Sequence, residues 1–242
     1  MPKVLVVIPA RFAATRFPGK PLELLWGKPM VQHVWERCSQ APSVDRVMVA
    51  TDDERILRAC AGFGAEAVMT DPALPSGTDR VAAAMQSLPD FDIILNVQGD
   101  EPAMETEVIA AVATLMRDGG VKIGTAVVPA SVDDEFLRPH VVKAVVAHDG
   151  RAMYFSRSLV PFVRNHVAGL RPHFRHLGIY GFQRSVLERL VLLPQSPLEQ
   201  TESLEQLRWL EAGFSIHTVS VQSRSVGIDT PEDLQNLSLR TP

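Results

Sequence analysis

The sequence predicts an α/β protein whose first part forms a mostly parallel sheet. Short apolar runs alternate along the chain with stretches whose apolar residues recur at helical spacing, and this order is typical of βαβ units. The apolar runs do not alternate with polar residues, as expected for strands that are covered on both faces. After about residue 120 hairpin signals appear, which favour a second lobe with more antiparallel pairing.

The first 120 residues contain four expected strands and at least three expected helices. The strands are apolar runs at residues 3–8, 46–50, 65–69 and 92–97. Helical spacing of apolar residues covers 30–38, where Pro29 suits a first turn, and also 56–60 and 109–116.

The second lobe, residues 121–242, is expected to be fused to the first in one compact unit around one cleft. Strands are expected at 122–128, 141–147, 153–155 and 175–182, with a turn at Asp149-Gly150. Helices are expected at 185–193 and 201–212, and a last one begins at Pro231 with Thr230 as N-cap. Residues 196–199 fit a capping box or a turn equally well.

The composition excludes several classes of protein. The chain has 242 residues, 24 basic and 28 acidic side chains, a net charge of −4 and 46% hydrophobic residues. This balance argues against a general nucleic-acid or membrane binder, and no apolar run approaches the roughly 18 residues of a membrane helix. Two cysteines cannot build a disulfide scaffold. We therefore expect a cytoplasmic protein with reduced thiols.

The loop after the first strand carries three cations, Arg11, Arg16 and Lys20. Ligands of open α/β sheets bind beyond the carboxyl ends of the strands, and a loop of this kind suits a polyphosphate. The loop is not a Walker loop, because Pro21 follows Lys20 and no glycine lies five residues before Gly19. A solvated basic loop is the alternative.

Two acids are candidates for holding a divalent cation. Asp100 follows Gly99 at the end of the fourth strand, and Asp229 lies just before the last helix. Mg²⁺ is usually held by one or two carboxylates together with substrate phosphates. Alternatively, Asp100 caps a turn and Asp229 complements a helix dipole. Together with the cationic loop, the two acids would assemble a magnesium–polyphosphate site.

Other polar residues allow two interpretations each. Ser76 and Arg80 mark either a helix start with a recognition role for Arg80 or a plain cap with a surface arginine. His176 and Tyr180 share one face of an expected strand, where a lone histidine is more often structural. Glu205 lies on an amphipathic helix and could simply be solvated, as could Gln206 beside it.

In their order along the chain, several of these stretches resemble 3-deoxy-manno-octulosonate cytidylyltransferases, also called CMP-Kdo synthetases. The resemblance spans nearly the whole chain and is carried by residues 9–20, 76–80, 96–102, 154–157, 176–180, 204–208 and 227–234. It implies a fold of the nucleotide-diphospho-sugar transferase type and a homodimer. It also implies the reaction of CTP with Kdo to give CMP-Kdo and pyrophosphate, a step toward the lipopolysaccharide core.

The resemblance implies that residues 1–120 bind CTP and that residues 121–242 bind the sugar and form the dimer. It also implies roles for individual residues. It assigns the CTP phosphates to Arg11, Arg16 and Lys20, and magnesium to Asp100 and Asp229. The region around the cytosine and the sugar–nucleotide junction is assigned to Ala10, Ser76, Arg80 and Gln98. The acid sugar is assigned to Gln98, Arg157, His176, Tyr180, Glu205 and Gln206, with Arg157 and His176 meeting its anion.

The chain departs from the family pattern at three places. Ala14 stands where serine is frequent, Phe17 stands where leucine is usual, and residues 223–226 lack the common Pro-Gly-small-Gly pattern. Two alternatives stay open at this point. One is a cytidylyltransferase for 8-amino-Kdo or another acid sugar, and the other is a catalytically silent nucleotide sensor on the same fold.

Overall fold

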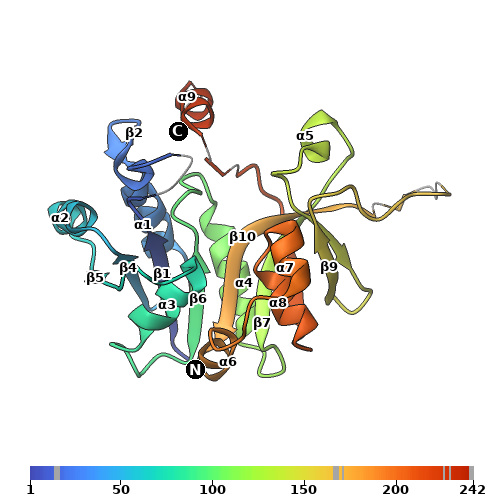
Figure 1. The fold of residues 1–242 in the computed structure, drawn as a ribbon, viewed down its shortest axis with the longest axis horizontal. Helices are drawn as coiled ribbons and strands as arrows, with labels where there is room; N and C mark the ends of the chain where they lie inside the picture. Colours follow the sequence, from blue (N-terminus) through green and yellow to red (C-terminus); the bar gives the residue numbers. More distant parts are fainter. Residues whose placement is uncertain (14–16, 166–168, 171, 226, 229, 240–242) are drawn as a thin grey trace.

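The computed structural model describes residues 1–13, 17–165, 169–170, 172–225, 227–228 and 230–239. Within them, one nine-stranded sheet forms the centre, with β8 and β9 attached beside β10 and the remaining strands in the order β11-β7-β10-β6-β1-β4-β5 (Figure 1). Its strands are β1 (Val4–Ala10), β4 (Arg46–Thr51), β5 (Ala67–Met69), β6 (Ile93–Val97), β7 (Ile123–Pro129), β8 (Lys143–Val146), β9 (Ala152–Ser156), β10 (Phe174–Gln183) and β11 (Ile216–Ser220). A separate hairpin pairs β2 (Leu24–Leu25) with β3 (Lys28–Pro29).

The pairing confirms the predicted fold class. β1 is parallel to β4 and β6, and β4 is parallel to β5. β10 is antiparallel to β6, β7 and β8, whereas β11 is parallel to β7. Because β10 lies between β6 and β7, it joins the two parts of the chain in one continuous sheet.

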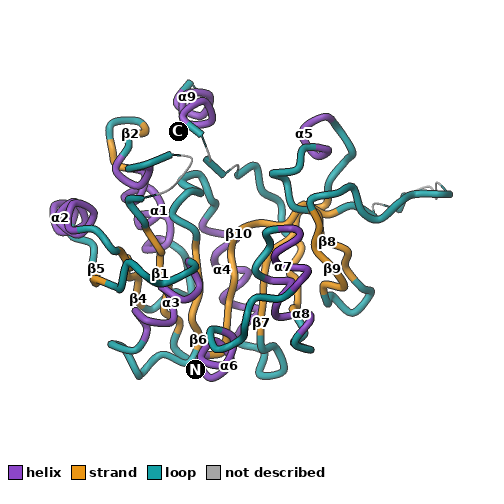
Figure 2. The backbone as a smooth tube through the Cα atoms, viewed as in Figure 1, coloured by secondary structure: helices purple, strands orange, loops and turns teal. Residues whose placement is uncertain are grey.

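Helices cover both faces of the sheet (Figure 2). Val4, Val6 and Ile8 of β1 pack with buried residues of α1 (Met30–Gln40), α2 (Glu54–Phe63) and α4 (Thr106–Met116). Leu5 and Val7 pack on the opposite side with α3 (Gly77–Met85), α6 (Arg184–Leu190) and α8 (Gln206–Glu211). All five side chains are fully buried, and each such burial stabilises the fold by about 1.5–3 kcal/mol. The shorter elements are η1 (Lys20–Leu22), α5 (Asp134–Leu137), α7 (Pro197–Glu202) and α9 (Pro231–Ser238).

Several helix starts agree with the sequence. Thr230 and Asp233 form a capping box at α9, as predicted from Thr230 and Pro231. Of the two interpretations of residues 196–199, the capping box is correct, with Pro197 in the first turn of α7. Satisfying the free N–H groups of the first turn in this way typically stabilises a helix by about 1 kcal/mol.

Other expectations were wrong or incomplete. The single helix expected at 201–212 is two helices, α7 and α8, because Ser203 takes a left-handed conformation with φ 51°. Pro29 is the N-cap of α1 rather than part of its first turn. The β2–β3 hairpin and β11 had no counterpart in the sequence analysis. Trp26 and Gly27 both have positive φ, 49° and 81°, which is the backbone of a type I′ hairpin turn.

Two negative findings apply to the part of the chain that the structure describes. No helix there is long and apolar enough to cross a membrane. Cys38 and Cys60 are free and buried, and burial raises the pKa of both thiols. Neither thiol is therefore poised to act as a nucleophile.

Candidate active site

Three segments that are distant in sequence meet at the carboxyl ends of β1 and β6. The Lys20 ammonium lies 3.0 Å from a carboxylate oxygen of Asp100 and donates a 2.8 Å hydrogen bond to the carbonyl of Ile228. The Ile228 N–H in turn donates to the Asp100 carbonyl at 2.8 Å. Gly99 permits this approach, since a Cβ there would lie 3.0 Å from the Pro9 carbonyl oxygen. The segments that were predicted to bind phosphate and metal are therefore adjacent.

The chemistry at this point fits a divalent cation with few protein ligands. The Asp100 side chain is 33% exposed, so its carboxylate can still take a ligand. The residue after Ile228 is Asp229, which, like Arg16, lies outside the described residues. Among the described residues no three acidic, histidine or cysteine side chains form a metal-binding group. Such a site leaves most coordination positions to substrate oxygens and water, as is usual for Mg²⁺.

Two arginines share one carboxylate beside the first loop. Arg80 is fully buried, lies 2.9 Å from Asp52 and donates to the Thr70 hydroxyl. Arg11 lies 3.9 Å from the same carboxylate. The interpretation of Arg80 as a surface residue is wrong. The Nε atoms of both arginines are buried without a hydrogen-bond partner in the described structure. Because two guanidinium groups face one carboxylate, a net positive charge remains at this end of the sheet.

The start of α3 contacts the second lobe through Glu205. Its two carboxylate oxygens accept hydrogen bonds from the hydroxyls of Ser76, at 2.8 Å, and Thr78, at 2.7 Å. Arg208 lies 3.6 Å away, and burial raises the pKa of Glu205. Glu205 is thus not a solvated surface group. It joins a residue assigned to the nucleotide region, Ser76, to the lobe assigned to the sugar.

His176 is held as a neutral hydrogen-bond acceptor. Its Nε2 lies 2.9 Å from the Thr125 hydroxyl, which donates its own proton to the Ile179 carbonyl at 2.7 Å. The hydroxyl must therefore accept from Nε2–H, and Nδ1 is left as the acceptor. Burial and the nearby Arg175 lower the pKa of His176 to about 3. The structure thus argues against the expectation that His176 supplies positive charge to an anion.

The remaining residues that the resemblance assigned to the sugar lie on β10, α8 and the end of β9. The Tyr180 ring is 5.2 Å from that of His176 and packs against Trp209, while its buried hydroxyl has no partner in the described structure. Arg157 donates to three backbone carbonyls, those of Pro139, Glu202 and Ser203. Gln206 is buried at the start of α8 and Ala10 at the end of β1.

A cavity of about 470 Å³ is lined by three of the predicted site residues, but not by Tyr180, Arg157, Gln206 or Ala10. Its size is within the usual range of ligand pockets. Gln98, Asp100 and His176 line it together with the loop between β7 and β8. The predicted metal ligand and two predicted sugar residues therefore face one space. Its other lining side chains include Glu101, Phe136, His140 and Arg175.

Glu101 is a residue of this site that the sequence analysis missed. Its side chain is buried, and its carboxylate accepts hydrogen bonds from Gly178 N–H and the Ser225 hydroxyl, both at 3.1 Å. Burial and the neighbouring Asp100 raise the pKa of Glu101 to about 7. A signal existed in the sequence, because Glu101 directly follows Asp100, but its partners lie 77 and 124 residues away.

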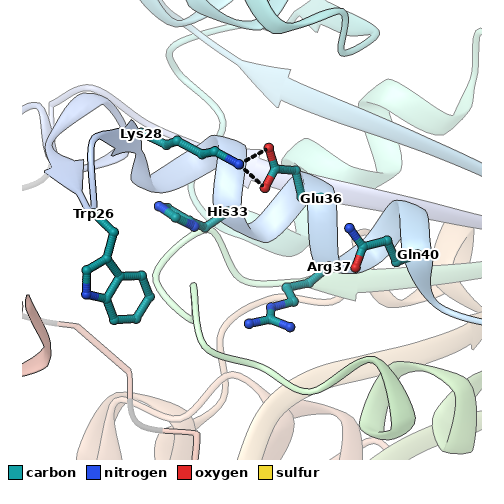
Figure 3. A pocket seen from close by; sticks show the side chains of 6 residues that line it. All are labelled: Trp26, Lys28, His33, Glu36, Arg37 and Gln40. Atoms are coloured by element: carbon teal, nitrogen blue, oxygen red, sulfur yellow. Dashed lines mark hydrogen bonds and ion pairs between the residues drawn. The ribbon is translucent and has the colours of Figure 1, made fainter. Parts of the chain in front are cut away.

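A second cavity, of about 270 Å³, lies along the outer side of α1. Figure 3 shows the Lys28 ammonium against the Glu36 carboxylate, with Trp26 and Arg37 lower in that view. None of the predicted site residues lines this cavity. We therefore place the candidate active site at the carboxyl ends of β1 and β6.

The chain is similar to known cytidylyltransferases. Residues 5–218 match the family model described as cytidylyltransferase. The chain is 49% identical over 235 residues to the 3-deoxy-manno-octulosonate cytidylyltransferase of Myxococcus xanthus, covering 97% of this chain and 95% of the relative. It is 45% identical over 242 residues to the protein of that name from Thermodesulfovibrio yellowstonii, covering 96% and 95%.

Solved structures show the same fold. A CMP:2-keto-3-deoxy-manno-octonic acid synthetase complexed with CTP superposes with a TM-score of 0.91 at 42% identity, covering 98% of this chain and 97% of that one. A 4-diphosphocytidyl-2C-methyl-D-erythritol synthase from Anaerococcus prevotii reaches a TM-score of 0.66 at 13% identity, covering 98% and 95%. This second likeness concerns the fold alone.

Proposed function

The chain belongs to the 3-deoxy-manno-octulosonate cytidylyltransferase family, and from that premise we propose how its residues serve the reaction. The enzyme transfers the cytidylyl group of CTP to Kdo, giving CMP-Kdo and pyrophosphate. The observation that carries the assignment of residues is the shared cavity of Gln98, Asp100 and His176. It joins a carboxylate suited to a metal–phosphate complex with polar groups suited to a sugar.

Residues 1–120 bind CTP in this proposal. Lys20 and Arg16 neutralise the phosphates, with Arg11 beside them, because all three belong to the loop that follows β1. Arg80 lies in the region assigned to the cytosine and the sugar–nucleotide junction. It is fully buried, and its ion pair with Asp52 holds the guanidinium in one orientation. Support for this part comes from the 3.0 Å contact of Lys20 with Asp100, since phosphate oxygens that bind Lys20 would lie close to a metal ion held by Asp100.

Asp100 and Asp229 would hold Mg²⁺ in this proposal. When bound, the ion would lower the pKa of the attacking hydroxyl and neutralise charge on the departing pyrophosphate. The hydrogen bond from Ile228 N–H to the Asp100 carbonyl supports the pair, because Asp229 is the next residue along the chain. A carboxylate pair of this kind matches the oxygen ligands that Mg²⁺ prefers.

Residues 121–242 bind the sugar. His176 accepts a hydrogen bond from a sugar hydroxyl at Nδ1, and Tyr180, with its unpartnered hydroxyl, offers a second polar contact. Three further polar side chains are assigned to the sugar: Gln98, Glu205 and Gln206. Arg157, at the end of β9, supplies positive charge for the carboxylate of the sugar. A site built to pair with hydroxyls discriminates strongly against analogues that lack them.

In the chemical step the C2 hydroxyl oxygen of Kdo bonds to the α-phosphorus of CTP. The bond between the α-phosphorus and the bridging oxygen breaks, its electron pair leaves with pyrophosphate, and the hydroxyl proton passes to water. The cations of the first loop stabilise the charge that builds on the leaving group. We assign no side chain as general base.

The proposed function is tested by measuring pyrophosphate release over a grid of nucleotides and acid sugars, with and without Mg²⁺. We expect release only with CTP, Kdo and the metal together. A preference of more than tenfold in kcat/KM for 8-amino-Kdo, about 1.4 kcal/mol, would overturn the choice of sugar. Binding of CTP without any release would point instead to a silent nucleotide sensor.

We also propose that the enzyme is a homodimer that works in the cytoplasm. The chain between β9 and β10 extends away from the sheet (Figure 1), and large apolar side chains are exposed on it and on β9. Their exposed fractions are 86% at Phe162, 65% at Met153 and 63% at Leu170. A second copy would cover such a patch. The cytoplasmic location is supported by the free, buried Cys38 and Cys60 and by the nucleotide substrate.

Sedimentation tests the dimer. We expect twice the monomer mass for the unmodified chain and a shift toward monomer for Phe162→Asp. Met69→Asp is the matched control, because Met69 is also exposed but lies on β5, at the far edge of the sheet. A monomeric unmodified chain, or an equal effect of both variants, would contradict the proposed interface.

A further inference from the structure

One buried carboxylate connects three parts of the site. Glu101 follows Asp100 directly, and only 8% of its surface is exposed. One of its oxygens accepts from the backbone N–H of Gly178 on β10, and the other accepts from the hydroxyl of Ser225. The same residue therefore contacts the strand that carries His176 and the segment that leads to Asp229.

The contact with β10 lies at an irregularity of that strand. The register of β10 with β7 shifts between His176 and Tyr180, and β10 pairs with β6 only from Ile179 onward. Gly178 thus lies just beyond the residues paired with β6, and Glu101 provides the acceptor for its N–H. Glycine at position 178 allows this close approach, because a Cβ there would lie 2.8 Å from the Glu101 oxygen and would force it to move. Glu101 therefore fixes the backbone between the two aromatic residues assigned to the sugar.

The second contact is with residues 223–225, which belong to the stretch 223–226 where the chain departs from the family's Pro-Gly-small-Gly pattern. Arg175 donates to the carbonyls of Ser223 and Ser225, and the Ser223 hydroxyl donates to Glu105 at 2.6 Å. Ser225 itself is buried, and its hydroxyl donates to Glu101. Side chains rather than glycine flexibility therefore hold this segment.

We propose that Glu101 is a positioning residue that sets strand β10 and residues 223–225 relative to Asp100. It acts through the hydrogen bonds to Gly178 and Ser225 and does not ligate the metal. The inference rests on the proposed function, because it concerns how the residues of that reaction are aligned. These hydrogen bonds can fix such an alignment, because a buried donor that loses its acceptor is strongly disfavoured.

The test compares Glu101→Ala, Glu101→Gln, Ser225→Ala and the double variant Glu101→Ala/Ser225→Ala. Glu107→Ala is the control, since Glu107 is exposed and its carboxylate accepts a hydrogen bond from the hydroxyl of the neighbouring Thr106. The readouts are kcat and KM for both substrates, calorimetric binding of CTP with Mg²⁺, and amide hydrogen exchange at Gly178 and Ile228. Thermal unfolding checks that each variant is folded.

We expect Glu101→Ala to lower kcat/KM by at least about tenfold, to weaken binding of CTP with Mg²⁺ and to speed exchange at both amides. Glu101→Gln should stay within about threefold of the unmodified enzyme, because its amide oxygen can accept from Gly178 and its amide nitrogen can donate to the Ser225 hydroxyl. Ser225→Ala should have a smaller effect, and no further effect once Glu101 is alanine.

Three results would overturn the inference: a Glu101→Gln variant as impaired as Glu101→Ala, independent effects of Glu101 and Ser225, or unchanged binding and exchange in Glu101→Ala. If Glu101→Ala does not fold, the Glu101→Gln and Ser225→Ala variants decide. The proposed function fails separately, when the unmodified enzyme and Glu107→Ala release no pyrophosphate.

Discussion

Replacing Lys20 by methionine tests whether its ammonium serves to bind CTP or to stabilise the fold. The Lys20 side chain is 14% exposed, and its ammonium contacts Asp100, whose side chain is 33% exposed, and the Ile228 carbonyl. Water can therefore solvate the Asp100 carboxylate after the change. A partly exposed ion pair contributes about 0–1 kcal/mol to stability. A charge-assisted hydrogen bond to a phosphate is worth about 1.5–3 kcal/mol, or roughly tenfold to more than a hundredfold in rate.

We therefore expect Lys20→Met to lower kcat/KM for CTP by about tenfold or more while unfolding at nearly the same temperature. The assay is pyrophosphate release at varied CTP, paired with thermal unfolding. If the contact tightens on the departing pyrophosphate, kcat falls as well as the affinity for CTP.

Lys28→Met is the matched control, because Lys28 also pairs with one carboxylate, that of Glu36 at 2.8 Å, but lies outside the candidate active site. It should keep normal kinetics. Activity of Lys20→Met within about threefold of normal, or a loss of stability large enough to explain the loss of activity, would refute the reasoning.

Further predictions concern the metal, the histidine and the contact between the lobes. Asp100→Asn and Asp229→Asn should each keep the fold and lower turnover more than about a hundredfold, measured over a Mg²⁺ titration. His176 should stay neutral from pH 5.5 to 8 by NMR titration. Because its folded pKa is about 3 and its ordinary value 6.5, the unfolded chain takes up the proton first as the pH falls, so His176 should reduce stability progressively below about pH 6.5. Glu205→Ala should raise the KM for both substrates, since Glu205 accepts from Ser76.

Each of these has a contradicting outcome. Near-normal activity of Asp229→Asn at limiting Mg²⁺ would exclude the carboxylate pair. An imidazole resonance of His176 that titrates near pH 6.5, or a His176→Gln variant whose stability falls with acid as steeply as before, would contradict the neutral histidine. A Glu205→Ala enzyme with normal KM values for CTP and Kdo would show that the contact with Ser76 has no role in either site.

Features that depend on local pattern were available from the sequence alone. The unalternating apolar runs predicted β1, β4 and β6 because strands of a covered parallel sheet are apolar on both faces. Helical spacing predicted α1 and α4 because a 3.6-residue period places their apolar residues on one side. The positions of Lys20 and Asp100 just after two such strands also pointed to the candidate site, since parallel strands end at one edge.

Features that depend on contacts between distant residues were decided only by the tertiary structure. The insertion of β10 between β6 and β7 brings Gly178 to Glu101 across 77 residues, and no local period encodes such a pairing. The left-handed Ser203, which divides α7 from α8, interrupts a stretch with a continuous helical pattern. The neutrality of His176 follows from its burial beside Arg175, and burial is set by packing. Sequence periodicity determines which faces of each element are apolar, whereas the protonation and alignment of the site residues depend on what the assembled elements bring next to them.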